Sequence, residues 1–122
     1  MGNFTTKEQS KQMTKMGFSE KTCDMLYEHT GWVSLDTPTV RWCENIGCHM
    51  PCWSLGQLLK LYRATRTFLE GTGYHLAVLT ENNISIEKII SEFERVYNHV
   101  HHLYEIHANV VENYCDFSKV KI

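Results

Sequence analysis

The sequence predicts a single α+β domain that spans residues 1–122. Its expected parts, in chain order, are an N-terminal helical hairpin, a capped central helix, a short β-hairpin and a long C-terminal helix, at residues 5–30, 54–64, 65–80 and 85–114. Three observations support this fold class. Capping residues precede the helical stretches, glycines separate two β-prone segments, and the last third of the chain carries a regular apolar stripe.

The first helix is expected to begin at Thr5-Thr-Lys-Glu8, which matches a capping box. In this motif the threonine and the acidic side chain each bond the backbone of the other residue, so two helix-end N–H groups find partners. The helix should extend to about Met16, because Gly17 readily adopts the left-handed conformation that ends helices.

A second helix is predicted from Ser19 to Gly31, which would complete the hairpin. Ser19 is a favourable N-cap residue. Three side chains then share one helical face: Cys23, Leu26 and Tyr27. The segment that follows is irregular, because it is interrupted by prolines and a glycine, and Thr39–Trp42 could form a short strand or a helical turn.

The central helix has the clearest start in the sequence. Ser54 and Gln57 match a capping box, and Trp53 and Leu58 occupy the positions of a hydrophobic staple. The helix should run to about Ala64. These motifs explain Trp53 and Ser54 without any catalytic role.

A β-hairpin is predicted next. Thr65–Leu69 and Tyr74–Thr80 are rich in β-branched, aromatic and other apolar residues, and Gly71-Thr-Gly73 lies between them as a turn. These glycines are not expected to hold a phosphate, because no helix follows them directly.

The final helix should begin after Ser85 and reach at least Leu103. Its apolar residues recur in steps of three and four, which defines one face of a helix. A stripe that is longer than the core of a small domain suggests a partner protein or a homodimer seam. Phe93, Tyr97, Val100 and Tyr104 are expected to pack on the N-terminal hairpin, and any surplus of this stripe is the possible partner surface.

Composition limits the class of protein. Hydrophobic residues make up 43% and charged residues 21% of the chain, as in folded proteins. The formal net charge of −2 provides no global attraction to nucleic acid or to an anionic membrane, so we expect neither partner. The N-terminus is polar and lacks the apolar region of a signal peptide, and the cysteine number is odd, so we expect reduced thiols and a cytoplasmic location.

The opening Thr-Thr-Lys-Glu-Gln-Ser, the turn Met-Gly-Phe-Ser-Glu-Lys-Thr and the sequence Pro51-Cys-Trp-Ser-Leu-Gly-Gln-Leu-Leu59 resemble a known group of proteins. These are small uncharacterised proteins of gut bacterial and phage-like mobile elements that share a Pro-x-Trp-Ser-Leu-x-x-Leu-Leu motif. The resemblance covers residues 5–60 and implies an accessory role in a mobile element, but it brings no catalytic residue or ligand. Met16–Ser19 is also similar to the loop of ubiquitin-associated domains, which would require a third helix near Thr39–Asn45.

Four potential zinc ligands lie close together: Cys43, Cys48, His49 and Cys52. Structural zinc is usually held by two ligand pairs on separate turns, and this loop offers only one well-spaced pair. His29 or Cys115 would then have to complete the site. The alternative is that the cysteines pack as small apolar residues, and we expect no bound cofactor or metal.

Two further clusters have both functional and structural explanations. On the final helix, His99, His102 and Glu105 could share a face and bind a metal or sense pH, but they lack the His-Glu-x-x-His pattern. The basic segment Lys60–Arg66 could contact phosphates, although cations near a helix C-terminus also complement its dipole.

No residue of the sequence lies in a recognisable context for nucleophilic catalysis. We therefore expect a non-enzymatic, cytosolic binding or accessory protein of unknown partner, with no cofactor. The alternatives are a zinc-stabilised module that uses Cys43, Cys48 and Cys52, and a nucleic-acid-binding regulator.

Overall fold

The computed structural model describes residues 3–30, 33–34, 37–40, 50–82, 84–106 and 116–122. Within these residues it contains three α-helices, which are α1 (Lys7–Lys15), α2 (Leu55–Phe68) and α3 (Ile86–Ile106). Five short strands are β1 (Met25–Tyr27), β2 (His29–Thr30), β3 (Val33–Ser34), β4 (Thr39–Val40) and β5 (Met50–Cys52). The predicted α+β class is therefore confirmed. None of the described helices has both the length and the apolar content needed to cross a membrane.

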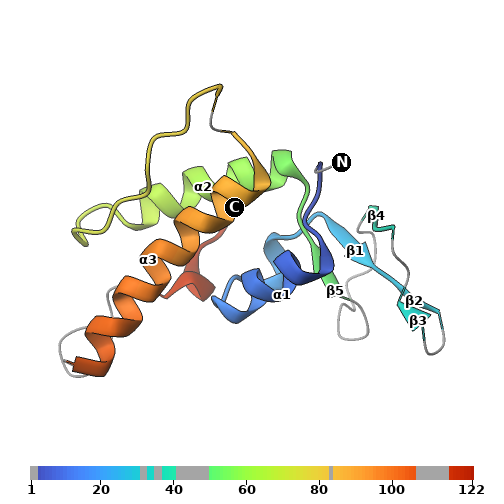
Figure 1. Cartoon of the computed structure of the whole chain (residues 1–122), viewed down its shortest axis with the longest axis horizontal. Helices are drawn as coiled ribbons and strands as arrows, with labels where there is room; N and C mark the ends of the chain where they lie inside the picture. Colours follow the sequence, from blue (N-terminus) through green and yellow to red (C-terminus); the bar gives the residue numbers. More distant parts are fainter. Residues whose placement is uncertain (1–2, 31–32, 35–36, 41–49, 83, 107–115) are drawn as a thin grey trace.

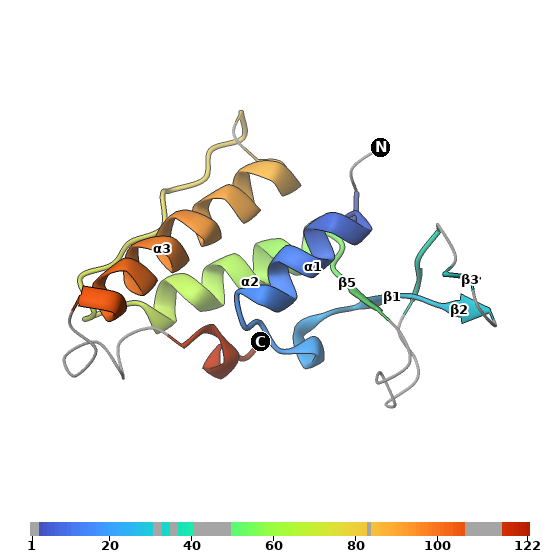
Figure 2. The ribbon, with the colours of Figure 1, turned by 60° about the horizontal axis from the view of Figure 1, so that its bottom comes forward.

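The helices form one body and the strands project from it, as both ribbon views show (Figures 1 and 2). The strands form a three-stranded antiparallel sheet of order β4-β1-β5 and a separate β2-β3 hairpin. In the sheet, Met25 lies opposite both Val40 and Cys52. Because β1 is the central strand, residues far apart in the sequence are joined through it.

The core lies where α1, α2 and α3 meet the C-terminal segment. Phe18, Phe93 and Phe117 form its aromatic centre, with the Phe18 and Phe117 rings stacked at 4.7 Å and the Phe18 and Phe93 rings tilted at 4.6 Å. Phe117 lies in a single 3-10 turn near the C-terminus, so this segment packs into the helical body. Trp53 and Leu58, the predicted staple residues, are both fully buried in the same core.

The helix starts follow the predicted capping chemistry with two differences. At α1 the capping box is formed by Thr6 and Gln9, one residue later than expected. At α2 the Ser54 hydroxyl accepts the predicted hydrogen bond from the Gln57 N–H at 3.1 Å. The Gln57 side chain does not bond back, because it donates instead to a backbone carbonyl oxygen elsewhere. Asp24 takes the place of the Gln57 side chain in the capping box and accepts from the Ser54 N–H at 2.9 Å.

The prediction of a second helix in the N-terminal hairpin is wrong. Ser19 does cap a helical turn, but this turn is a 3-10 helix of three residues, Glu20–Thr22, and strand β1 follows it. Leu26 and Tyr27 are buried as predicted, but they are buried in a strand. The short apolar run suits either element, and the pairing of β1 with both β4 and β5 decides between them.

The predicted β-hairpin at residues 65–80 is also wrong. Helix α2 continues through Phe68 instead of ending near Ala64. The hydroxyl of Thr65 donates to the Leu61 carbonyl oxygen at 2.7 Å, which satisfies a β-branched polar residue inside the helix. Residues 74–80 have no strand partner among the described residues.

Helix α3 begins as predicted. The Ser85 hydroxyl accepts from the Lys88 N–H at 3.1 Å, and the Ser85 carbonyl oxygen accepts from the Ile89 N–H at 3.0 Å. The helix extends through Ile106, and residues 107–114 of the predicted helix lie outside the described residues.

Candidate functional site

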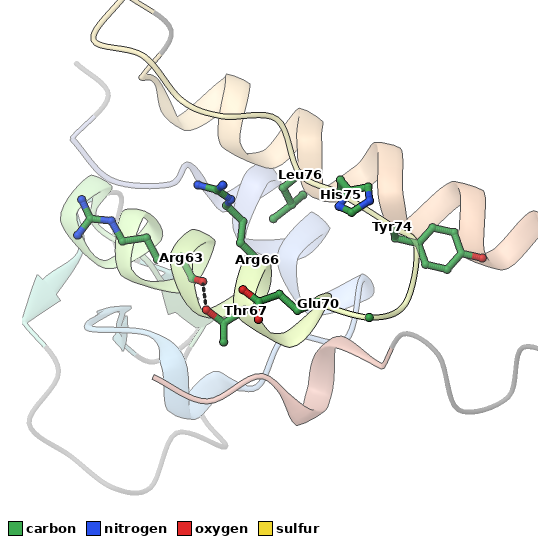
Figure 3. Close-up of a pocket in the computed structure, with 8 residues that line it drawn as sticks. Arg63, Arg66, Thr67, Glu70, Tyr74, His75 and Leu76 are labelled. Atoms are coloured by element: carbon green, nitrogen blue, oxygen red, sulfur yellow. Dashed lines mark hydrogen bonds between the residues drawn. The ribbon is translucent and has the colours of Figure 1, made fainter.

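A groove of about 540 Å³ lies between the second half of α2 and the segment that follows it (Figure 3). It is lined by charged, polar and aromatic residues, which are Arg63, Arg66, Thr67, Glu70, Gly71, Tyr74, His75 and Leu76. Leu76 is buried and contributes an apolar floor. The two walls are neighbours in the sequence: one is the helix α2, and the other is the irregular segment that follows it.

The first wall is the solvent face of α2. Its opposite face, which includes Leu58, Leu61 and Tyr62, is buried in the core. Helical periodicity therefore directs Arg63 and Arg66, one turn apart, towards solvent. In Figure 3, Arg66 extends towards the segment that carries Leu76, and the Arg63 guanidinium lies at the other end of the α2 wall.

Neither arginine is neutralised within the part of the chain that the structure describes. The two described salt bridges join Lys11 to Glu8 and Arg95 to Glu92, and no described acidic residue pairs with Arg63 or Arg66. Glu70 is the one carboxylate in the groove lining. The two guanidinium groups therefore remain available to an anionic group.

The second wall is the irregular segment 71–80. Gly71 and Gly73 have positive φ angles of 85° and 87°, which glycine adopts without steric cost, and they turn the chain back along α2. The three residues that line the groove, Tyr74, His75 and Leu76, follow this turn directly.

Three side chains from the helices hold this wall by hydrogen bonds to its backbone. Tyr62 of α2 donates to the Ala77 carbonyl oxygen. Glu92 of α3 accepts from the Ala77 N–H at 3.0 Å, and Arg95 donates to the His75 carbonyl oxygen. These bonds replace those that a partner strand would supply, so the wall has a fixed position relative to α2 and α3.

Burial and charge set the protonation states of this network. Burial by itself raises the pKa of the Glu92 carboxyl, but hydrogen bonds from Arg95 and from the Ala77 N–H, together with nearby positive charges, lower that pKa below its usual value. The pKa of the Tyr62 phenol is raised, mainly by burial and then by the charge of Glu92. Glu92 is therefore an ionised acceptor and Tyr62 a protonated donor at neutral pH.

The end of the groove at Tyr74 carries an additional aromatic contact. The Tyr74 and His99 rings meet edge to face with centroids 5.5 Å apart. His99 is exposed on α3, so an aromatic pair and two cations lie at different ends of the same region.

The groove lining contains two arginines, which are suited to binding an anionic group. Arginine forms paired, charge-assisted hydrogen bonds to phosphate and carboxylate groups. The only hydroxyl on the α2 wall, that of Thr67, donates to the Arg63 carbonyl oxygen at 3.2 Å. No described groove residue forms a hydrogen-bonded pair of nucleophile and general base.

The predicted zinc ligands are only partly described. Cys43, Cys48 and His49 lie outside the described residues. Cys52 is fully buried, and its thiol donates to the Thr5 carbonyl oxygen at 3.3 Å. Burial is the largest influence on this thiol and raises its pKa, which favours the protonated form over the thiolate that zinc requires. Across the part of the chain that is described, no three metal-binding side chains cluster.

On α3, the described residues of the predicted stripe are buried or half-buried within the chain. Phe93 and Val100 are core residues, with 0% and 7% of their surface exposed. Tyr97 is half-buried, and its hydroxyl donates to the Lys15 carbonyl oxygen at 3.4 Å. The Tyr104 side chain lies outside the description. The described part of the stripe therefore packs α3 onto its own chain.

The basic half of the groove is evident from the sequence, but the groove itself is not. Lys60–Arg66 is a cationic segment by composition, whereas the pattern around Tyr74 and His75 predicts a strand. The signal that could have found the site is the pair Gly71 and Gly73 directly after an uninterrupted helical pattern, because it turns the following residues back along the helix.

The resemblance to mobile-element proteins rests on sequence motifs alone. Comparisons of the chain with protein-family models, with curated proteins and with solved structures find no match.

Proposed function

We propose that this chain is a non-enzymatic binding protein that holds the anionic group of a ligand in the groove between α2 and residues 71–80. The observation that carries this proposal is the pair Arg63 and Arg66, which line a groove of about 540 Å³ and form no ion pair with any described residue. Two such guanidinium groups can together contact one or more phosphates or carboxylates.

Preorganisation of the opposite wall supports the proposal. A groove binds more tightly when its walls need no ordering at the moment of association. Hydrogen bonds from the side chains of Tyr62, Glu92 and Arg95 to the backbone of residues 75–77 hold this wall before any ligand binds. Glu92 and Arg95 neutralise each other at 2.9 Å, so this support adds no net charge to the site.

The position of the arginines also has an explanation that needs no ligand. Cations in the last turn of a helix complement its dipole, and Arg66 lies there. This effect falls off within one turn and does not account for Arg63. It also does not explain why an irregular segment is held at a fixed place beside the same face of α2.

The test is a titration of the isotope-labelled protein followed by NMR, with inorganic phosphate and ATP as probes. Amide shifts should concentrate at residues 63–76 and should be lost in Arg63→Gln and Arg66→Gln. Lys11→Gln removes the same charge from an exposed position of α1, a helix that contributes no groove residue, and it should leave the shifts intact. Shifts spread evenly over all basic residues, or no shifts, would contradict the proposal.

The wider setting of this binding role follows from the sequence. We infer a cytoplasmic accessory protein of a mobile element, because of the motif resemblance over residues 5–60 and because Cys52 is a reduced thiol that donates a hydrogen bond to the Thr5 carbonyl oxygen. Disulfide analysis under native conditions should then find reduced cysteines throughout the chain.

A further inference from the structure

The groove is long, and its functional groups are spread along it. Helix α2 rises about 1.5 Å per residue, so the six steps from Arg63 to the C-cap at Leu69 span about 9 Å. Tyr74 lies beyond that point, at the opposite end from Arg63 (Figure 3). A single compact anion cannot contact both ends, whereas an extended ligand can.

The cations continue as a row along α2. Lys60, Arg63 and Arg66 are each exposed and follow at intervals of three residues, so they share one side of the helix. A row of this kind matches a ligand with repeated charges along its length.

Glu70 argues against a ligand with concentrated charge. Its carboxylate lies in the groove lining between the arginines and Tyr74, and no described salt bridge neutralises it. It would repel the clustered charges of a triphosphate more strongly than a chain that carries one charge per repeat.

Tyr74 supplies a surface of a different chemistry. Its ring is half-buried and meets His99 edge to face at the end of the groove lining. Aromatic rings beside a cationic groove are how proteins hold single-stranded nucleic acid, because every base presents a π-face.

We propose that the groove binds single-stranded nucleic acid, with consecutive phosphates on Arg63 and Arg66 and a base on Tyr74. This inference rests on the proposed anion-binding function and names its ligand. Duplex DNA fits less well, because its bases are already stacked and offer no free face to Tyr74.

The test measures fluorescence anisotropy of a labelled twelve-nucleotide oligo-dT with the full chain. Each phosphate contact contributes a salt slope of about −0.7, so two contacts should weaken binding about sevenfold between 50 and 200 mM salt. Arg63→Gln with Arg66→Gln should flatten that slope. Tyr74→Leu should weaken binding about tenfold, whereas Tyr74→Phe and Lys11→Gln should change it little.

An abasic oligonucleotide of equal length carries the phosphates without the bases, and it should bind like oligo-dT to Tyr74→Leu but less tightly to the natural chain. Circular dichroism checks that each variant is folded. If ATP and phosphate shift the groove amides but oligo-dT binds no tighter than ATP, this inference fails while the anion-binding function stands. If none of the three probes shifts the groove, both fail. Unchanged oligo-dT affinity in a folded Tyr74→Leu also overturns the inference.

Discussion

Glu92 is the residue on which the position of the groove wall most depends. Its carboxylate is almost fully buried, yet both oxygens have partners: Ala77 N–H at 3.0 Å and the Arg95 Nε at 2.9 Å. A buried charge is tolerated when it is paired and hydrogen-bonded in this way. The same side chain therefore contributes to the stability of the fold and to the geometry of the groove.

Glu92→Gln should lower the free energy of unfolding by about 1–2 kcal/mol at pH 7, because it removes the charge from a hydrogen-bonded pair. The pKa of Glu92 is lower in the folded than in the unfolded chain, so the ionised group stabilises the fold above the unfolded pKa of about 4.3, and this contribution is lost as the pH falls through the folded value. Urea unfolding from pH 7 to pH 3 should show a steeper loss for the natural chain than for Glu92→Gln.

Asp116 also has a lowered pKa, chiefly because it accepts hydrogen bonds from Ser118, and its effect on acid stability is present in both proteins. The difference between their curves therefore isolates Glu92. Parallel curves would show that its charge does not support the fold.

At the scale of elements, the start of α2 depends on a residue from a distant part of the chain. Asp24, just before β1, accepts from the Ser54 N–H and from the Ser54 hydroxyl. The first helix differs, because Thr6 and Gln9 cap it locally. The sheet region and the helical body are thus coupled where α2 begins.

Ser54→Ala and Asp24→Ala should each destabilise the fold by about 1 kcal/mol, as expected for loss of a helix cap. Because the two side chains act together, the double variant should lose at least about 0.5 kcal/mol less than the sum. Thr6→Ala combined with Asp24→Ala provides the matched control and should be additive. Chemical denaturation gives all the values, and strict additivity for Ser54 and Asp24 would contradict the coupling.

The elements that could be predicted are those whose signals are local. Ser85 and the apolar stripe fixed the start and face of α3, and Gly17 fixed the end of α1. The strand β1 could not be predicted, because its partners β4 and β5 are distant in sequence. Thr65 was misleading, because its β preference is offset by a hydrogen bond within the helix that only the structure reveals.

The groove could be predicted only in part for the same reason. The cations of α2 are evident from the sequence, and so is their possible contact with phosphate. The placement of Tyr74 and His75 opposite them depends on side-chain bonds from Tyr62, Glu92 and Arg95 to the backbone. No local pattern encodes bonds of this kind.

For the molecule as a whole, the helical body carries the groove and the strands project from this body (Figure 2). A second link between the two parts passes through Thr5, whose carbonyl oxygen accepts from the Tyr27 hydroxyl at 2.7 Å and from the Cys52 thiol. The Thr5 hydroxyl also accepts from the Trp53 N–H at 3.1 Å. Cys52 is therefore part of a buried polar cluster that joins α1, β1 and β5.

The purified protein should carry no stoichiometric zinc. Cys52 would have to leave this cluster and lose its proton to become a ligand, and burial opposes the charged form. Elemental analysis by mass spectrometry after dialysis measures the metal content directly. One zinc per chain, with unfolding on addition of a chelator, would contradict this prediction and direct attention to Cys43, Cys48 and Cys52.

The most direct test of the central claim compares two charge-matched double variants for binding of ATP by isothermal titration calorimetry. Arg63→Gln with Arg66→Gln removes the cations of the groove, and Lys11→Gln with Lys15→Gln removes the same charge from exposed positions of α1. We expect the first pair to weaken binding at least about tenfold and the second less than about twofold, since a charge outside the site acts only through the screened long-range field. Equal losses from the two pairs would show that the anion is attracted by charge in general, and the groove would not be the binding site.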